Sequence, residues 1–377
     1  MKKLLALLLA VVMVMGLVAC GGTEENNKTT EGGDTAAMDV AVFYYTYDDV
    51  YISSVRSNMD TKLTAANVKY TNYDCKNDQA TQNDLIKTAI TNGANLLVVN
   101  VVNSGNADAA KKIIDIAEGL PVVFFNRAVE GEGEEGKILG KYENVCFIGT
   151  DAPEAGHLQG KMVGDYVLAN FDALDLNKDG KISYAMFKGD EGNAEAIFRT
   201  QFGVEDANAV LTAAGKPALE YFNATAEKPY QVDMAGAWST QAALEYMQTN
   251  LAEFNEGNGN MIELVICNND GMAEGVVKAL NTAGYNTGAG STMIPVFGVD
   301  ATDSAKQLIA DGKMTGTVKQ DAVGMADAIV ATVNAVAEGK TIVDAVAAAA
   351  ATNTAIFSVA DGVASKLFVA YAPYTGE

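Results

Sequence analysis

Short apolar runs alternate with amphipathic stretches along most of this chain, and that alternation limits the folds it can adopt. A short apolar run predicts a buried strand, and an apolar stripe at helical spacing predicts a helix packed against it. Strands alternating with helices form parallel sheets covered by helices on both faces, so the sequence predicts an α/β fold. The apolar runs are residues 40–45, 96–99, 122–125, 145–148, 182–187, 264–267, 295–299 and 314–318, and the amphipathic stretches include 81–91, 107–117, 154–168 and 240–251.

The number of predicted strands and the chain length together indicate two lobes. Eight apolar runs are too many for one comfortable sheet, and 377 residues exceed the usual size of a single domain. The alanine-rich segment 345–351 carries no recognisable chemistry and is predicted to be helical.

The first residues have the pattern of a bacterial lipoprotein signal. Lys2 and Lys3 precede an apolar run, residues 4–15, that is too short to span a membrane comfortably. The sequence Leu-Val-Ala-Cys follows at 17–20, which predicts removal of residues 1–19 and a lipid on Cys20. An ordinary cleaved signal peptide is the alternative. Either segment predicts an extracytoplasmic protein, and the lipid would anchor it to the cell membrane.

Residues 20–37 are predicted to be a tether, and the rest of the chain is strongly acidic. Residues 21–37 lack large apolar side chains, which is typical of a flexible segment. The chain has 48 acidic residues against 26 lysines and arginines, a formal charge of −22, which argues against nucleic acid and against anionic lipid headgroups as partners. Cys146 and Cys267 lie in apolar runs, so buried free thiols are expected instead of a disulfide or a metal site.

Polar residues follow several of the predicted strands. In open α/β sheets the ligand crevice lies at the carboxyl ends of the strands. Asp, Asn and Gln carry two polar atoms in a plane, which suits the hydroxyls of a polyol because each hydroxyl donates and accepts. Helix capping is the competing explanation, since Asp and Asn also begin helices. The residues are Asp49, Asn126, Asn269, Asp300 and Gln320.

One segment has the front half of an EF-hand calcium loop. Gly180 occupies the sixth position, where the loop turns sharply, but Met186 occupies the twelfth, where a bidentate Glu is expected. The sequence therefore predicts a structural calcium ion whose last carboxylate comes from elsewhere; an Asp/Asn/Gly turn without an ion is the alternative. Loop positions 1, 3, 5, 7 and 9 fall on Asp175, Asn177, Asp179, Lys181 and Ser183, with Lys181 offering its carbonyl oxygen.

Taken together, these motifs resemble the galactose/glucose-binding members of the type I periplasmic binding proteins. The resemblance extends from about residue 40 to about residue 371. It is carried by residues 47–49, 122–126, 149–151, 175–180, 268–270 and 294–300. It implies two doubly wound parallel-sheet lobes joined by a three-strand hinge, with crossings near 150–152, 320 and 367–369. The N-terminal lobe would comprise 39–150 plus 320–367, and the C-terminal lobe 151–319 plus 368–377.

The resemblance also implies which residues form the binding sites. The family's sugar-binding residues match here at Asp49, Asn126, Arg199, Trp238, Asn269 and Asp300. This chain differs at four further positions, where Tyr51, Asn193, Glu195 and Gln320 replace Phe, His, Asp and Asn. Tyr51 and Trp238 would sandwich the sugar ring, and Glu263 would complete the calcium site, in which Ser183 replaces a Gln.

The implied function is that of an extracytoplasmic solute-binding protein. It would capture a monosaccharide, D-galactose or D-glucose, between its lobes and present it as a monomer to the permease of an ABC transporter, with a chemoreceptor as a further partner. Another sugar (ribose, xylose or a furanose) or a sensor-linked receptor is the alternative.

An enzyme and a transcriptional regulator are less consistent with the sequence. His157 is the only histidine, and the GxGxxG match at 131–136 contains three glutamates that would repel a pyrophosphate. A sugar-responsive repressor would need a basic headpiece, which residues 1–37 do not provide.

Overall fold

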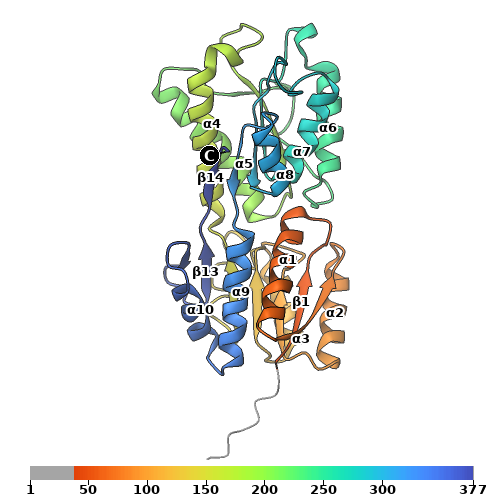
Figure 1. The fold of residues 1–377 in the computed structure, drawn as a ribbon, viewed down its shortest axis with the longest axis vertical. Helices are drawn as coiled ribbons and strands as arrows, with labels where there is room; N and C mark the ends of the chain where they lie inside the picture. The colour runs from red at the N-terminus through yellow and green to blue at the C-terminus, as the bar shows by residue number, and fades with distance from the viewer. Residues whose placement is uncertain (1–37, 377) are drawn as a thin grey trace, which may run out of the picture. The chain divides into compact units, whose positions relative to one another are not determined.

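The computed structural model describes residues 38–376, which belong to one compact unit. The predicted signal peptide, Cys20 and the tether lie outside the described residues. Within residues 38–376 no helix is both long enough and apolar enough to cross a membrane. The chain forms two α/β lobes, which confirms the predicted fold class (Figure 1).

The first lobe is built on a seven-stranded sheet in the order β12-β13-β5-β4-β3-β1-β2. All neighbouring strands are parallel except β12 and β13. Helix α1 packs against α9 and α9 against α10, while α2 packs against α3, so two helical layers enclose the sheet. The strands are β1 (Asp39–Tyr44), β2 (Lys69–Asp74), β3 (Leu96–Val99), β4 (Val122–Phe125), β5 (Val145–Gly149), β12 (Phe357–Val359) and β13 (Lys366–Val369); the helices are α1 (Val50–Ala65), α2 (Gln79–Thr91), α3 (Ala107–Ala117), α9 (Ala322–Ala337) and α10 (Ile342–Ala351).

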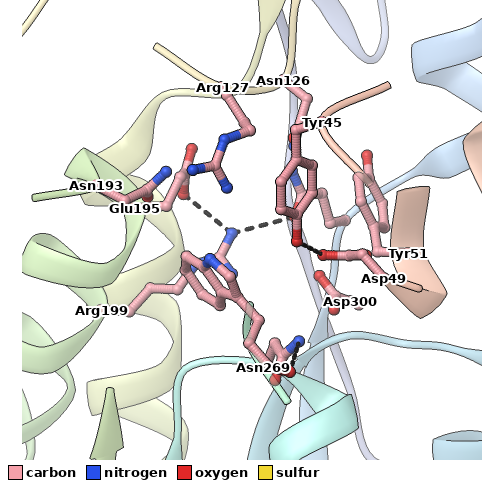
Figure 2. A pocket seen from close by; sticks show the side chains of 12 residues that line it. Tyr45, Asp49, Tyr51, Asn126, Arg127, Asn193, Glu195, Arg199, Asn269 and Asp300 are labelled. Carbon is pink, nitrogen blue, oxygen red and sulfur yellow. Dashed lines mark hydrogen bonds and ion pairs between the residues drawn. The ribbon is translucent and has the colours of Figure 1, made fainter. Parts of the chain in front are cut away.

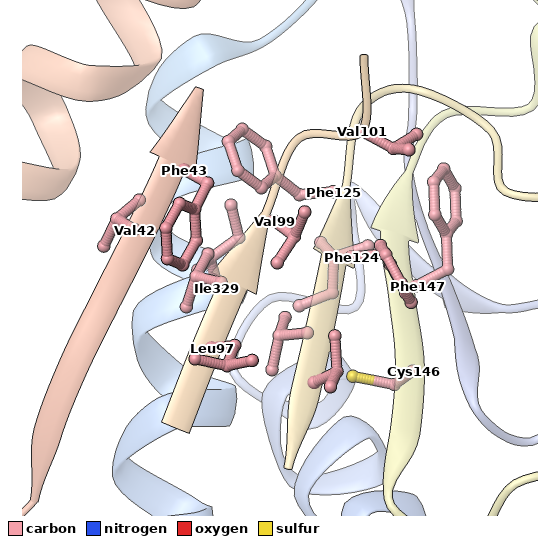
Figure 3. Packing of buried hydrophobic residues seen from close by; sticks show 14 of the residues in the cluster. Val42, Phe43, Leu97, Val99, Val101, Phe124, Phe125, Cys146, Phe147 and Ile329 are labelled. Carbon is pink, nitrogen blue, oxygen red and sulfur yellow. The ribbon is translucent and has the colours of Figure 1, made fainter. Parts of the chain in front are cut away.

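The core of this lobe lies along its central strands. Every residue of β3, β4 and β5 is buried, as expected for strands covered on both faces. Figure 3 shows their packed side chains together with Ile329 of α9. Cys146 lies in this core, where burial raises the pKa of its thiol to about 12. Cys75, Cys146 and Cys267 are all free and buried, which confirms the expectation for the thiols.

The second lobe is built on another seven-stranded sheet, in the order β14-β11-β10-β9-β6-β7, with β8 also paired to β6. Only β14 runs antiparallel to its neighbour. The strands are β6 (Ser183–Lys188), β7 (Glu220–Tyr221), β8 (Gln231–Val232), β9 (Leu264–Cys267), β10 (Val296–Asp300), β11 (Gly316–Lys319) and β14 (Ala372–Tyr374); the helices are α4 (Ala152–Leu174), α5 (Ala194–Ala213), α6 (Thr240–Glu253), α7 (Asp270–Thr282) and α8 (Asp303–Ala310), with one 3₁₀ turn at Glu256–Asn258.

The chain passes between the two sheets three times. It crosses from β5 to α4, returns from β11 to α9, and crosses again from β13 to β14. The third crossing was predicted at residues 367–369, but β13 lies wholly in the first sheet, so the crossing falls at Ala370 and Tyr371. The boundary at 367/368 is therefore two to three residues too early, because that apolar run is a full strand of the first lobe.

Helices α4 and α5 approach closely because glycines line their contact. A Cβ atom on Gly160 would lie 2.2 Å from the carbonyl oxygen of Phe202, and one on Gly156 would lie 2.4 Å from that of Phe198. Helix α5 carries Glu195 and Arg199 in its first two turns. The glycines of α4 therefore fix the position of two predicted site residues.

We expect Gly160→Ala to lower the free energy of unfolding by about 2 kcal/mol or more, since the added methyl group meets backbone that cannot move aside. The matched control is Gly203→Ala in α5, where the nearest atom is the side-chain oxygen of Gln159 at 3.2 Å. In Gly203→Ala the higher helix propensity of alanine offsets the crowding, so we expect the free energy of unfolding to change by less than about 1 kcal/mol. Urea denaturation measures both, and equal effects would contradict this account of the helix contact.

Candidate functional site

A pocket lies where the carboxyl ends of the strands from the two sheets face each other. Twelve residues line it, and they come from both lobes and from one crossing segment (Figure 2). All ten residues predicted for the site are among them, and two further residues, Tyr45 and Arg127, were not predicted. The lining residues are Tyr45, Asp49, Tyr51, Asn126, Arg127, Asn193, Glu195, Arg199, Trp238, Asn269, Asp300 and Gln320.

Three of the pocket residues also begin helices. Asp49, Asn193 and Asn269 are the N-caps of α1, α5 and α7, and each accepts a hydrogen bond from the backbone of the first turn. One oxygen of each side chain serves the helix, and its other polar atom is available elsewhere. Asp49 Oδ2 accepts a hydrogen bond from the Tyr45 hydroxyl at 2.7 Å, and Asn193 Nδ2 donates to Ser104 Oγ of the other lobe at 3.0 Å. Capping and pocket lining are thus compatible roles.

The backbone is strained at three of the pocket residues. Asn126, Trp238 and Asp300 have φ angles of 58°, 56° and 127°, in the region that side-chain-bearing residues rarely adopt. Such conformations persist where surrounding packing enforces them, and they are frequent at binding sites. Trp238 is held by Gly189, because a Cβ atom on that glycine would lie 2.2 Å from the indole ring.

Arg199 and Glu195 form a buried ion pair at one side of the pocket. Arg199 Nη2 donates to Glu195 Oε2 at 3.0 Å, and Nη1 donates to the carbonyl oxygen of Asn268 at 2.9 Å. Nη2 also donates to Gln320 Oε1 at 3.1 Å and to the Tyr371 hydroxyl at 2.8 Å. Only 3% of the Arg199 side chain is exposed, so the guanidinium depends on these partners.

Glu195 is held by the crossing segments as well. The Thr150 hydroxyl donates to Glu195 Oε1 at 2.7 Å, and the Tyr371 hydroxyl lies 2.8 Å from Glu195 Oε2. Thr150, Gln320 and Tyr371 belong to the first, second and third crossings. The ion pair on α5 is therefore bonded to every segment that joins the lobes.

Four buried polar atoms at the pocket have no hydrogen-bond partner among residues 38–376. Three are obligate donors, namely Arg199 Nε, Trp238 Nε1 and Gln320 Nε2, and the fourth is the Tyr51 hydroxyl. A buried polar group without a partner is costly, about 1–3 kcal/mol each. The pocket thus offers hydrogen bonds to a ligand rich in acceptor oxygens.

The charges at the pocket nearly balance. Burial, and then the neighbouring Asp270, hold the pKa of Asp300 well above its usual range, while Arg199 acts in the opposite direction. The pocket is lined by three carboxyl groups, those of Asp49, Glu195 and Asp300, and by two guanidinium groups, those of Arg127 and Arg199. Such a pocket favours an uncharged ligand, because a net charge would be buried without a counterion.

Asp270 lies behind the pocket at the start of α7. Its carboxyl oxygens accept hydrogen bonds from the Thr317 hydroxyl at 2.7 Å and from the Thr302 amide at 2.8 Å. Burial raises its pKa to about 7, against those two hydrogen bonds, which lower it.

The two unpredicted lining residues, Tyr45 and Arg127, differ in how the sequence could have revealed them. Tyr45 ends the first apolar run, and its aromatic character made it look like a core residue of the strand. Arg127 follows Asn126 directly and donates from Nε to the carbonyl oxygen of Val101 at 2.9 Å. Its place directly after Asn126 was the available signal for Arg127. Nothing in the sequence separates Tyr45 from the strand, which ends at Tyr44.

In the predicted calcium loop, carboxylate oxygens bind backbone N–H groups. Asp175 accepts hydrogen bonds from the amides of Asp179 and Gly180 at 3.1 and 3.0 Å. Glu263 reaches the loop from a distant part of the sequence. Its two carboxylate oxygens accept hydrogen bonds from the backbone amides of Leu176, Asn177 and Ser183, and burial raises the pKa of this carboxyl group. Oxygen atoms of this kind are the ligands that a hard cation prefers. Within residues 38–376, however, no three acidic, histidine or cysteine side chains converge as a group that could hold a metal ion. The calcium site therefore stays a prediction.

His157 lies on the surface of α4, away from the pocket. Its Nδ1 is 2.7 Å from Asp206 Oδ2, and its ring stacks on Phe202. The glutamate-rich segment 131–136 is a loop, in which Glu134 accepts a hydrogen bond from the amide of Ala107 at the start of α3. The contacts of His157 and of Glu134 in the segment 131–136 are thus with neighbouring helices and not with the pocket.

Comparison with known proteins gives matches over most of the chain. Residues 40–341 match a family model described as a periplasmic binding protein domain. The D-galactose/methyl-galactoside binding periplasmic protein MglB of Haemophilus influenzae is 34% identical over 304 residues, which are 80% of this chain and 82% of that protein.

Solved structures with a similar fold include two solute-binding proteins of ABC transporters. One from Bacillus halodurans with bound myo-inositol has a TM-score of 0.65 at 20% identity, covering 91% of this chain and 96% of that one. Another from Clostridium phytofermentans with bound β-D-glucose has a TM-score of 0.63 at 21% identity, covering 90% and 94%. At such identities the likeness shows the fold.

We expect the Asp270 carboxyl to make stability depend on pH. Its folded pKa of about 7 lies above the ordinary value of about 3.9, so the stabilisation is complete below about pH 4 and is lost as the pH rises through about 7. Asp270→Asn mimics the protonated carboxyl, so its unfolding free energy should match that of the wild type at pH 4 and exceed it by a few kcal/mol at pH 8.

Urea denaturation from pH 4 to pH 8 measures this difference. Asp303→Asn is the matched control, because that carboxylate is fully exposed on the next helix. Parallel pH profiles of the wild type and Asp270→Asn would contradict the assigned pKa.

Proposed function

This chain belongs to the periplasmic binding protein family, and from that premise we propose that it captures a neutral monosaccharide in its pocket and delivers it to an ABC transporter. D-galactose or D-glucose is the preferred ligand in this proposal. The identity of 34% to a galactose-binding relative supports that choice. The permease of the transporter is the proposed partner, with a chemoreceptor as a further one, and the protein would act as a monomer without catalysing a reaction.

The observation that carries the proposal is the set of unpartnered polar atoms in the pocket. Arg199 Nε, Trp238 Nε1 and Gln320 Nε2 can donate to sugar oxygens, and the Tyr51 hydroxyl can donate or accept. Asp49 offers acceptor capacity to the sugar hydroxyls. Tyr51 and Trp238 add aromatic surface, which suits the apolar C–H faces of a pyranose. Few ligand classes other than an uncharged polyol combine these requirements.

Glu195 and Gln320 bear on which sugar fits. Each is one methylene longer than the residue that the family has at the equivalent position, and each accepts a hydrogen bond from Arg199. Because Glu195 and Gln320 extend further into the pocket and both bond Arg199, we expect these two positions to select the epimer and the ring size of the sugar. Ribose, xylose and a furanose therefore belong in any test panel beside the two hexoses.

Sugar binding would favour the closed arrangement of the lobes. Lobe one supplies Asp49 and Asn126 to the pocket and lobe two supplies Arg199 and Trp238, so a ligand in the pocket would contact both lobes. A ligand shifts such an equilibrium by its differential affinity for the two states. The closed arrangement is then the form offered to the permease.

We expect a saturable change in tryptophan fluorescence on titration with the correct monosaccharide, since Trp238 is the only tryptophan and lines the pocket. Trp238→Phe keeps an aromatic face but removes the N–H donor, so calorimetry should show a loss of affinity of about tenfold. Tyr246→Phe is the control, because its hydroxyl donates to the carbonyl oxygen of Val232 outside the pocket. Unchanged fluorescence with every hexose and pentose would refute the proposed function.

We further propose that calcium binds the loop that begins at Asp175. The support is the oxygen-rich sequence pattern and the approach of Glu263 to the loop. The oxygen atoms of Asp175, Asn177, Asp179, Lys181, Ser183 and Glu263 would hold the ion, which would cross-link the loop to β9 as a structural element.

We expect calcium to raise the melting temperature of the chelator-treated wild type. At a free calcium concentration of 100 times the dissociation constant, the gain in unfolding free energy should be about 2.7 kcal/mol. Glu263→Gln should abolish the calcium-dependent rise, and should melt lower than the wild type even with chelator because one acceptor oxygen is lost. Asp172→Asn is the control, since that carboxylate lies near the loop but is 94% exposed. Identical melting curves of the wild type with calcium and with chelator would count against the ion.

The membrane anchor is also a proposal. The basic, apolar and Leu-Val-Ala-Cys segments of residues 1–20 support lipid attachment at Cys20 on the outer side of the cell membrane.

A further inference from the structure

A second, larger cavity adjoins the pocket and is lined by residues of both lobes. This outer cavity has a volume of about 670 Å³, and Arg127 lines both it and the inner pocket. Residues of both lobes line the outer cavity, among them Asn103 and Asn106 from lobe one and Lys228 and Asp233 from lobe two. The two spaces therefore meet at Arg127.

Arg127 makes an ion pair across the cleft. Its Nη2 lies 3.3 Å from Asp190 Oδ2 of the other lobe, and its side chain is only 5% exposed. Lobe one holds the guanidinium in place, because Nε and Nη2 donate to the carbonyl oxygens of Val101 and Val102 at 2.9 and 3.0 Å. The guanidinium also lies over the ring of Tyr45, 4.2 Å from its centroid.

Asp190 also has a hydrogen-bond partner within its own lobe. Its Oδ1 accepts a hydrogen bond from the amide of Gly192 at 2.9 Å. The preceding residue, Gly189, lies directly against the indole of Trp238, and Gly236 leaves room for the Asp190 carboxylate. Each partner of the ion pair thus contacts an element that positions a pocket residue.

We propose that the Arg127–Asp190 pair is a gate that closes the inner pocket over one sugar ring and excludes a second ring. The inference rests on the proposed function and names the size limit of its ligand. With the pair formed, the two side chains separate the inner pocket from the outer cavity. Without the Asp190 side chain, a substituent on the sugar can extend into the outer cavity, where amide and charged side chains can bind its hydroxyls.

Besides excluding a second ring, the Arg127–Asp190 pair should slow the release of the bound monosaccharide. It joins lobe one to lobe two, so it exists only while the lobes are together, and its loss favours the open state. Dissociation of a monosaccharide should therefore become faster when either the charge or the side chain of Asp190 is removed. Size exclusion, in contrast, depends on the space that the side chain fills.

Two substitutions at Asp190 separate these effects. Asp190→Asn keeps the volume and an acceptor for the Gly192 amide but loses the charge, whereas Asp190→Ala also empties the space. Calorimetry gives the affinities for galactose, glucose, lactose and melibiose, and stopped-flow fluorescence of Trp238 gives the release rates. Asn77→Gly is the matched control, since Asn77 Nδ2 bonds the carbonyl oxygen of Ala235 across the same cleft without touching Arg127, and its φ of 53° suits glycine.

We expect both Asp190 variants to release the monosaccharide about tenfold faster than the wild type. Only Asp190→Ala should lower the ratio of monosaccharide to disaccharide affinity, by tenfold or more, while Asn77→Gly leaves that ratio unchanged. An unchanged ratio in Asp190→Ala, with the monosaccharide still bound, would overturn the gate alone. Absence of binding of any monosaccharide to the wild type would overturn both the gate and the proposed function.

Discussion

The burial of Arg199 is the constraint on which the rest of the binding site depends. A guanidinium that is 3% exposed needs charged and polar partners, because burying an unpaired charge costs several kcal/mol. Glu195 supplies the charge, and Gln320 and Tyr371 supply two further acceptors. Gln320 and Tyr371 bond Arg199, and Thr150 bonds Glu195. Since these three residues each belong to a different crossing, the ion pair on α5 fixes the geometry of all three connections. The pocket and the hinge are in this sense parts of one hydrogen-bond network.

Where that hydrogen-bond network faces the pocket, several donors lack partners within residues 38–376, and these donors are available to a ligand. Arg199 Nε, Trp238 Nε1 and Gln320 Nε2 are buried without partners among the described residues, so the closed arrangement carries a free-energy cost that a ligand removes. Three carboxyl groups and two guanidinium groups line the pocket, so its charges nearly balance and a neutral ligand leaves that balance unchanged. The uncommon backbone conformations of Asn126, Trp238 and Asp300 are of the kind that is frequent at binding sites.

Much of the fold could be predicted because central parallel strands are buried on both faces. The runs at β3, β4 and β9 are uniformly apolar and were placed at their observed bounds. The edge strand β2 was missed, since its sequence Lys-Tyr-Thr-Asn-Tyr-Asp is polar and partly exposed, as were the short antiparallel strands β12 and β14. Their pairing depends on partners distant in the sequence, which local patterns do not reveal.

The candidate site could be predicted to a similar degree. Polar residues after strands, together with the family resemblance, identified ten of the twelve lining residues. Tyr45 escaped because it ends an apolar run, and Arg127 because its ion pair with Asp190 forms across the cleft. Thr150 and Tyr371 escaped because they act through Glu195. A crystal structure with bound galactose or glucose tests the central claim most directly. Our account predicts ring or hydroxyl oxygens within about 3.2 Å of Arg199 Nε, Trp238 Nε1 and Gln320 Nε2. A sugar bound elsewhere, with those three nitrogens still unpaired, would contradict it.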